Sequence, residues 1–278
     1  MDELLKMTAA TKKGERPQFA LRPSLPSLPD GGEAHLYSIF LDRAPGEMVE
    51  IKEWLSPEEK ARAEKFRFDL HRNRFIAGRA ALRQLLSAYV GAPPESLCFV
   101  YWQNGKPELQ QVQADVPLTF NLAHSDNLGL IGLSRSAAIG VDLERVRFLD
   151  DFDELVRRFF SPAETRAFLG LSFSEKPQAF FNLWTRKEAW LKATGEGIAY
   201  SLNQVEVSFS PEDTAVIRRL PAGNGEVEDW SLEAISVSPG FAAAVVTHSP
   251  HFHARFLNWP DHTFSFSAPH QNTQTQLS

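Results

Sequence analysis

Several common features are scarce in this sequence of 278 residues. Its one cysteine, Cys98, excludes a disulfide within the chain and a cysteine cluster that binds zinc. The longest apolar run, residues 241–246, is far shorter than the roughly 20 residues that span a membrane. Positive charge is also scarce, because 29 Lys and Arg face 35 Asp and Glu. The net charge of -6 argues against a protein that coats nucleic acid.

The remaining composition favours a folded protein in a reducing compartment. Hydrophobic residues make up 43% of the chain and aromatic residues 11%, which is enough for a packed core. The first 15 residues carry charges where a signal peptide needs an apolar stretch. We therefore expect a cytoplasmic protein that binds neither nucleic acid nor a membrane.

The middle of the chain repeats one order of predicted elements. Strands are predicted at 35–42 and 138–146, and each is followed by a Ser-Pro helix start, at Ser56 and Ser161. Long helices are then predicted at 69–89 and 175–194, each ended by glycine. A repeat of 105 residues suits two copies of one α+β domain with a ligand cleft between them, although short motifs also recur by chance.

The ends of the chain differ from this middle part. Proline alternates with small residues before residue 33, and the last residues offer little to bury. Both ends are predicted to be linkers, although the aromatic side chains after 249 also allow packing along the body. The predicted division is a Pro-rich N-terminal extension (1–33), an N-terminal half (34–136), a C-terminal half with the metal site (137–248) and a C-terminal tail (249–278).

Two acids in the second predicted strand are candidates for a metal site. Asp142 and Glu144 are two residues apart, so in a strand they share one face, while Val141 and Leu143 share the other. Carboxylates held about 7 Å apart on one face repel unless water or a cation lies between them, and hard oxygen ligands suit Mg²⁺. The alternative is a solvent-facing edge strand whose acids touch nothing.

The second long helix carries further charged residues at helical spacing. Trp184, Glu188 and Lys192 are spaced by four and line one face. Either Glu188 and Lys192 form an ordinary surface ion pair, or Glu188 completes a three-carboxylate site while lysines hold phosphate. In the first half, His124 and the arginines of the first long helix supply cationic donors, although a histidine after a short strand is more often structural.

Three motifs in this order resemble a known family. They are F-N-x-x-H-S at 120–125, I-G-V-D-L-E at 139–144 and L-W-T-R-K-E-A-W-L-K-A-T-G-E-G at 183–197. Together they resemble 4′-phosphopantetheinyl transferases of the surfactin-synthetase-activating (Sfp) type, over residues 35–247. The resemblance implies a pseudo-dimer of α+β halves that binds coenzyme A between them, in agreement with the repeat.

The resemblance also implies roles for individual residues. The metal-coordinating acids are Asp142, Glu144 and Glu188, and the catalytic residues are Glu188 and Lys192. The residues that bind coenzyme A are Arg62, Arg74, Lys106, His124, Trp184, Lys187 and Lys192. The chain departs from the family pattern at Glu59, which stands at one of two usually basic positions, and at Ala123, which replaces a serine beside the histidine.

The implied activity is that of a holo-[acyl-carrier-protein] synthase. Such an enzyme moves 4′-phosphopantetheine from coenzyme A to a serine of an apo acyl or peptidyl carrier protein, with Mg²⁺ as cofactor, and releases 3′,5′-ADP. Carriers of fatty-acid, polyketide and nonribosomal-peptide synthesis all remain open. The resemblance also favours a monomer with an internal pseudo-twofold axis.

We hypothesise a division of labour within this site. Lys192 would stabilise charge on the leaving phosphate, and Glu188 or a water that it orients would accept the serine proton. Carrier proteins are usually acidic, so docking needs local positive charge on a chain whose own net charge is -6. The candidate docking residues are Arg145, Arg147 and Arg158.

Two other functions use the same residues. A metal-dependent phosphoesterase or nuclease also needs paired acids and a lysine, but the acid-x-lysine type has lysine where this chain has Val146. A non-catalytic binder of coenzyme A or of a carrier would bind without transfer, yet all three acids and both lysines are present. The motifs therefore favour the transferase.

Overall fold

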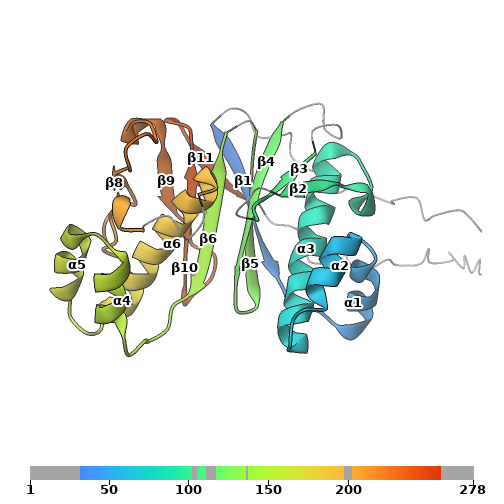
Figure 1. Cartoon of the computed structure of the whole chain (residues 1–278), viewed down its shortest axis with the longest axis horizontal. Coiled ribbons are helices and arrows are strands. Elements are labelled where there is room, and N and C mark those ends of the chain that lie inside the picture. Colours follow the sequence, from blue (N-terminus) through green and yellow to red (C-terminus); the bar gives the residue numbers. More distant parts are fainter. Residues whose placement is uncertain (1–31, 102–104, 111–116, 136, 197–201, 258–278) are drawn as a thin grey trace, which may run out of the picture.

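The molecule consists of two similar halves that pack through their sheets (Figure 1). The structure is a computed structural model and describes residues 32–101, 105–110, 117–135, 137–196 and 202–257. Each half is a sheet covered on its outer side by helices, so the layers run helices, sheet, sheet, helices across the molecule (Figure 1).

The N-terminal half has a mixed order of strands and helices. It runs β1 (Glu33–Phe40), α1 (Pro45–Lys52), α2 (Pro57–Ala63), α3 (Asp69–Val90), β2 (Phe99–Tyr101), β3 (Pro107–Leu109), β4 (Leu118–Ser125) and β5 (Leu128–Arg135). Strand β5 lies between β1 and β4 and pairs antiparallel with both. β2 and β3 form a separate hairpin.

The C-terminal half repeats this order. It runs β6 (Ile139–Arg145), α4 (Phe152–Phe159), α5 (Pro162–Leu169), α6 (Lys176–Thr194), β7 (Glu206–Val207), β8 (Ile217–Arg219), β9 (Ser231–Ala234) and β10 (Phe241–Thr247). The sheet order β6-β10-β9 matches β1-β5-β4, and β7 and β8 form the corresponding hairpin. The predicted α+β pseudo-dimer is confirmed.

The local signals that start and end the helices also repeat. Ser56 and Ser161 each accept a hydrogen bond from the amide of the glutamate three residues later, and that glutamate accepts one from the serine amide. α3 and α6 end at Gly91 and Gly195, both left-handed, a conformation that glycine adopts without steric strain. The same short signals therefore define the corresponding helices in both halves.

A buried ion cluster stabilises the N-terminal half. Glu59 is only 2% exposed and accepts from Arg79 Nε and Arg83 Nε, both at 2.6 Å. Arg83 also donates to the carbonyls of Pro94 and Leu97, at 2.8 and 2.9 Å. This cluster explains why an acid stands at a position that is usually basic in the family, because Glu59 neutralises two buried guanidinium groups.

Three hydrophobic cores hold the layers together. One lies between helices and sheet in each half. The third joins the two sheets and includes Leu36 and Leu130 from one half and Val141 and Val245 from the other, each fully buried. Burying one such side chain stabilises the folded state by roughly 1.5–3 kcal/mol. The contact between the two sheets therefore contributes to stability as a hydrophobic core does.

A last strand corrects the predicted C-terminal tail. β11 (His253–Leu257) pairs in parallel with β1, so the chain returns from the C-terminal half to the N-terminal sheet. The reading of residues 249–278 as a linker is therefore wrong for this strand. Residues 258–278 and nearly all of the N-terminal extension lie outside the described residues, and the division of the chain at 136/137 stays a proposal. In the described chain, no helix combines the length and apolarity needed to cross a membrane.

Candidate active site

The site residues are carried by β6 and α6, which pack closely together. Asp142 and Glu144 lie on β6, and Glu188 lies on α6. A Cβ atom at Gly140 would come within 2.0 Å of the carbonyl oxygen of Ala189, so only glycine allows this approach of strand to helix. Asp142 is 4% and Glu188 5% exposed, which excludes the alternative of solvent-facing acids.

The three acids interact electrostatically. Burial raises the pKa of Glu188 to about 7, and the negative charges of Asp142 and Glu144 contribute to the rise. Burial also raises the pKa of Glu144, and the charge of Asp142 adds to this effect. Asp142 and Glu188 are buried and Glu144 is half-buried, so the three acids form one cluster, and its role as a metal site stays a prediction.

Lys192 partly neutralises this cluster. Its Nζ donates to Asp142 Oδ1 at 2.5 Å, so the surface ion pair with Glu188 is not the pair that forms. Burial opposes the charged form of Lys192, but the carboxylate of Asp142 outweighs it and raises the pKa of the lysine. The cluster holds three acids against this one lysine, so the charge balance is favourable for a cation.

Two buried oxygens test whether the residues fit a metal ion. Among the described residues, Asp142 Oδ2 and Glu188 Oε1 are buried and have no hydrogen-bond partner. A buried oxygen without a partner destabilises the folded state. A hard divalent cation that both oxygens coordinate would supply the missing partner. The described residues contain no preformed group of three ligands, so the full ligand set stays a proposal.

Two basic residues of the N-terminal half, His124 and Arg74, lie near Lys192. Desolvation lowers the pKa of His124, and the nearby positive charges of Lys192 and Arg74 lower it further. The guanidinium of Arg74 donates to both carboxylate oxygens of Asp42, at 2.7 and 3.0 Å. His124 therefore lies near Arg74 of its own half and Lys192 of the other half, and the binding of coenzyme A by these residues stays a prediction.

Lys106, which the resemblance assigned to coenzyme A binding, has protein contacts instead. Its Nζ donates to the carbonyls of Ile139, Lys192 and Ala193, at 2.5 to 3.2 Å. Burial lowers its pKa to about 8. The ammonium group has three backbone acceptors and is turned into the protein, so Lys106 joins the N-terminal half to β6 and α6.

Lys187 requires a similar correction. It is fully buried, and its Nζ donates to Glu164 at 2.5 Å and to the carbonyls of Leu202 and Val205 at 2.9 and 2.6 Å. The arrangement matches that of Arg83 in the other half, where a buried cation also joins a capping glutamate to two carbonyls beyond the helix. With three protein acceptors, Lys187 is not available to a diphosphate.

The other predicted coenzyme residues have local contacts. Arg62 is exposed and lies over the ring of Phe75, 5.3 Å from its centroid. Trp184 stacks on Phe180 at 6.0 Å and belongs to the aromatic packing of the C-terminal half. Within the described chain, the contacts of these two residues are with aromatic rings and not with the acids, and their coenzyme roles stay predictions.

The predicted docking arginines lie on the C-terminal half near the end of β6. Arg145, Arg147 and Arg158 are exposed, and each guanidinium lies over a phenylalanine ring at 5.0 to 5.7 Å. Phe148 and Phe173 are 47% and 70% exposed, with ring centroids 4.8 Å apart. All five residues are exposed on the C-terminal half, and we refer to them together as the Arg/Phe surface.

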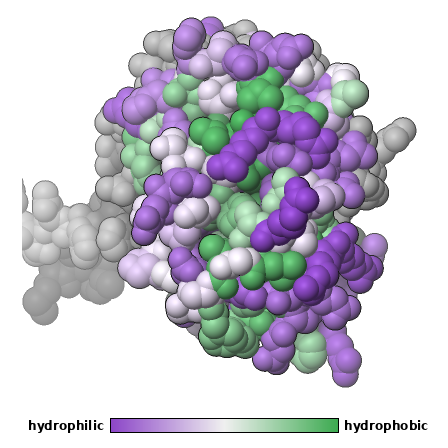
Figure 2. All heavy atoms as spheres, turned by 90° about the vertical axis from the view of Figure 1, so that its left-hand side faces the viewer, coloured by the Kyte–Doolittle hydropathy of each residue, from purple (hydrophilic) through white to green (hydrophobic). Residues whose placement is uncertain are grey.

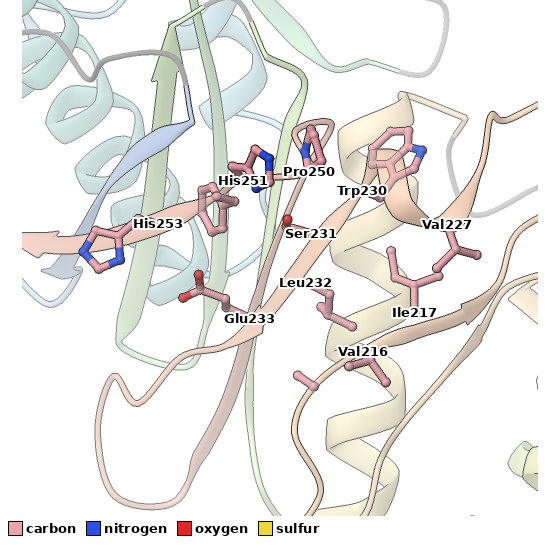
Figure 3. A pocket seen from close by; sticks show the side chains of 12 residues that line it. Val216, Ile217, Val227, Trp230, Ser231, Leu232, Glu233, Pro250, His251 and His253 are labelled. Atoms are coloured by element: carbon pink, nitrogen blue, oxygen red, sulfur yellow. The ribbon is translucent and has the colours of Figure 1, made fainter.

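A pocket of about 740 Å³ lies away from these residues. It is lined by β8, β9 and the segment before β11, with Trp230, Leu232 and His251 among its residues (Figure 3). None of the predicted site residues lines it. A pocket of this kind does not by itself locate the chemistry, since the perturbed acids lie on β6 and α6.

Two residues of β4 that were given no role from the sequence contact β6. Ser125 Oγ donates to Glu144 Oε2 at 2.7 Å, and Asn121 Oδ1 accepts from the amide of Val141 at 2.9 Å. Their spacing of four residues on one strand puts both on the same face, which was the available signal. Only the structure shows that this face meets β6.

Comparison with known proteins identifies the family. The profile described as "4′-phosphopantetheinyl transferase superfamily" matches residues 138–246, and "4′-phosphopantetheinyl transferase, N-terminal" matches residues 44–134. HetI, a 4′-phosphopantetheinyl transferase from a Nostoc species, is 40% identical over 223 residues, which are 80% of this chain and 90% of HetI. The chain belongs to the 4′-phosphopantetheinyl transferase superfamily.

A further sequence relative agrees with this membership. The 4′-phosphopantetheinyl transferase Sfp of Bacillus subtilis is 26% identical over 220 residues, covering 78% of this chain and 93% of Sfp. The structure was also compared with a solved holo-(acyl-carrier-protein) synthase from Bacillus anthracis in complex with CoA (3′,5′-ADP). The match covers 40% of this chain and 93% of the synthase, at 25% identity and a TM-score of 0.33. The Sfp-type resemblance of the motifs is confirmed by the sequence relatives.

Proposed function

We propose that this chain transfers 4′-phosphopantetheine from coenzyme A to a serine of an apo carrier protein, giving the holo carrier and 3′,5′-ADP. Membership of the superfamily and the names of HetI and Sfp support the reaction type. One observation of the structure carries the proposal, namely the meeting of Asp142, Glu144, Glu188 and Lys192 where β6 packs on α6.

Magnesium is the proposed cofactor. The buried oxygens of Asp142 and Glu188 that have no partner among the described residues, together with Glu144, would hold it. When bound, Mg²⁺ supplies positive charge to a diphosphate, which phosphoryl transfer needs. Loss of one acid should weaken this site, because the remaining oxygens leave the cation under-coordinated.

The cationic residues are proposed to bind and orient coenzyme A. His124 and Arg74 lie together on the N-terminal half and suit the phosphate of the nucleotide end. Lys192 is already held beside Asp142 and suits the diphosphate, where it would stabilise charge on the leaving phosphate. Arg62 and Trp184 remain weaker candidates, since their present contacts are with aromatic rings.

Glu188 is the proposed general base. A base works best when its pKa is close to the operating pH, and burial with neighbouring acids raises the pKa of Glu188 to about 7. Glu188, or a water that it orients, would take the proton of the attacking serine. Lys192 would keep the leaving side of the reaction positively charged.

A direct test combines the protein with coenzyme A, MgCl₂ and a panel of apo carriers. Intact mass measurement should show one added phosphopantetheine per carrier, and Asp142→Ala should lose this addition. Addition to several carrier classes would support use in more than one of the fatty-acid, polyketide and nonribosomal-peptide pathways. An Asp142→Ala rate near that of the wild type would contradict the acid assignment.

The same experiment separates the alternative functions. A binder without catalysis would bind coenzyme A but leave every carrier mass unchanged. A phosphoesterase or nuclease would release phosphate or degrade nucleic acid with no carrier present. We keep both as outcomes of the test, because neither accounts for the family membership.

Acidic carriers are proposed to dock on the Arg/Phe surface. The outer face of the C-terminal half shows hydrophobic patches between hydrophilic residues (Figure 2). Exposed Phe148 and Phe173 offer apolar contact, and Arg145, Arg147 and Arg158 offer positive charge on a chain of net charge -6. Charge reversal at Arg147 and Arg158 should raise KM for the carrier more than KM for coenzyme A, and equal effects would overturn this assignment.

The setting of the reaction is also a proposal. The lone Cys98 is exposed and forms no disulfide within the chain, which suits the reducing cytoplasm. A monomer is proposed because the internal pseudo-dimer already brings two equivalent halves together. Sedimentation of the purified protein at micromolar concentration would test the monomer directly.

A further inference from the structure

The two halves meet along β4 and β6. Among the described strands, β4 and β6 are each at the edge of a sheet. They lie in contact with each other but belong to different sheets. β10 takes one edge of β6, and antiparallel pairing directs the amides of alternate residues to the opposite edge. These amides need acceptors, because buried N–H groups are rarely left unpaired.

Two side chains of β4 supply the acceptors. Asn121 Oδ1 accepts from the amide of Val141 at 2.9 Å, and Ser125 Oγ accepts from the amide of Arg145 at 3.0 Å. The two acceptors are four residues apart on β4, and the two amides are four residues apart on β6. The two contacts therefore keep the same spacing along both strands. We call this line of contacts between β4 and β6 the seam.

Ser125 has a second contact that Asn121 does not have. Its Oγ donates to Glu144 Oε2 at 2.7 Å, and the side chain is only 8% exposed. A hydroxyl has one hydrogen to donate, and the amide of Arg145 already occupies an acceptor position on this oxygen. The hydroxyl hydrogen is therefore directed at the carboxylate of Glu144.

We propose that Ser125 is a positioning residue of the acid site and holds the Glu144 carboxylate in place for a divalent cation. The inference rests on the proposed function for the cation, but the contact itself does not. Groups that orient metal ligands are worth roughly 10–100-fold in metal affinity when they are lost. Ser125 belongs to the N-terminal half and Glu144 to the C-terminal half, so the seam links the fit of the two halves to the geometry of the site.

The test measures binding of Mn²⁺, a paramagnetic probe for hard divalent sites, to the full chain in the presence of coenzyme A. Free Mn²⁺ is followed by electron paramagnetic resonance. Ser125→Ala should weaken binding by about 10-fold, whereas Ser125→Thr keeps the hydroxyl and should restore most of the affinity. Ser231→Ala is the matched control, because Ser231 also makes a 2.7 Å hydrogen bond, to the carbonyl of Ser249, and lies on β9. It should leave Mn²⁺ affinity and transfer unchanged.

A second readout does not depend on the metal or on catalysis. Ser125→Ala removes the acceptor of the Arg145 amide, so hydrogen exchange at Arg145 should speed up by about 10-fold or more, with little change at Val141. A crystal structure of the variant should show the Glu144 carboxylate displaced. An Mn²⁺ affinity within twofold of the wild type, or an unmoved Glu144, overturns the positioning role.

The two proposals fail in different ways. If the wild type neither binds Mn²⁺ nor modifies any carrier, the proposed function is wrong, and with it the purpose assigned to Ser125. If the wild type binds and transfers while Ser125→Ala does so equally well, only the positioning role is wrong. A loss of kcat with an unchanged KM for coenzyme A in Ser125→Ala agrees with a displaced metal ligand rather than with a lost coenzyme contact.

Discussion

The fold disfavours the charged form of the Glu188 side chain. An ordinary glutamate has a pKa of 4.5, whereas burial and the neighbouring acids raise the pKa of Glu188 to about 7. Between these values the folded protein holds more protons than the unfolded chain, so the free energy of unfolding falls as the pH rises from 4.5 to 7. One pKa unit is worth about 1.4 kcal/mol, so above pH 7 the loss reaches up to about 3 kcal/mol.

Glu188→Gln should therefore make the metal-free protein more stable at pH 8, by up to about 3 kcal/mol, and should change stability little at pH 4.5. Urea unfolding in EDTA at both pH values measures this difference. Glu212→Gln, at an exposed position of the C-terminal half, is the control and should have little effect at either pH. A Glu188→Gln variant that is less stable than the wild type at pH 8 would refute the charge argument.

Lys187 shows how a residue in a functional motif can have a structural role. Its removal leaves Glu164 buried, together with two carbonyls that have lost their donor. Breaking a buried pair in this way costs roughly 3–5 kcal/mol. Lys187→Met should thus lower the free energy of unfolding by that amount.

The folded fraction of Lys187→Met should keep the wild-type KM for coenzyme A. The double variant Lys187→Met/Glu164→Gln removes both charges and should recover part of the loss. A large rise in KM with unchanged stability would instead restore the predicted phosphate contact. Thermal melts and steady-state kinetics on the same samples decide between the two.

The positions of the acids and of Lys192 could be predicted from the sequence, but those of Lys106 and Lys187 could not. Asp142, Glu144 and Glu188 occur at spacings that fix their faces on one strand and one helix, and burial follows once those elements pack. The direction of a lysine depends on which acceptors come near it in three dimensions. Lys187 meets a glutamate 23 positions earlier in the chain, and Lys106 meets carbonyls more than 30 positions later.

At the scale of elements, the approach of β6 to α6 depends on one residue. A Cβ at Gly140 would lie 2.0 Å from the carbonyl oxygen of Ala189 and 2.3 Å from the amide of Ala193, both backbone atoms that cannot move aside alone. Gly140→Ala must push strand and helix apart, which costs about 1–3 kcal/mol or more. Mn²⁺ binding should weaken as well, since Asp142 and Glu188 lie on the two separated elements.

Gly46→Ala is the matched control for this variant. Gly46 lies in α1, and a Cβ there would meet nothing within 4 Å. Because alanine favours helix over glycine, this change should be neutral or stabilising by up to about 1 kcal/mol. Denaturant unfolding of both variants measures the difference, and equal effects would contradict the close-packing argument.

The elements that were predicted and those that were missed differ in what specifies them. α3 and α6 have start and stop residues and an apolar pattern in their own sequence, so their bounds were predicted within one or two residues. α1 has too few apolar residues to form a clear stripe, and β11 is a strand because β1 provides a free edge beside it. Local sequence does not contain that second kind of information.

For the whole molecule, the question is what joins the two halves. β11 extends the N-terminal sheet, the seam pairs β4 with β6, and Lys106 crosses to the end of α6. The last of these contacts depends on a buried ammonium group whose pKa is lowered to about 8 because of burial. The folded state therefore holds fewer protons than the unfolded chain between pH 8 and 10.5, and stability from this group rises with pH in that window.

Lys106→Met removes a donor from three backbone carbonyls and should lower the free energy of unfolding by about 1–3 kcal/mol at pH 7.5. The gap between wild type and variant should widen at pH 9.5, because only the wild type is relieved of a buried charge. Lys52→Met removes an exposed pair with Glu64 and should cost less than about 1 kcal/mol. If Lys106→Met instead raised KM for coenzyme A without changing unfolding at either pH, its ammonium would belong to the coenzyme site, and the halves would be joined by β11, the seam and the hydrophobic core between the sheets.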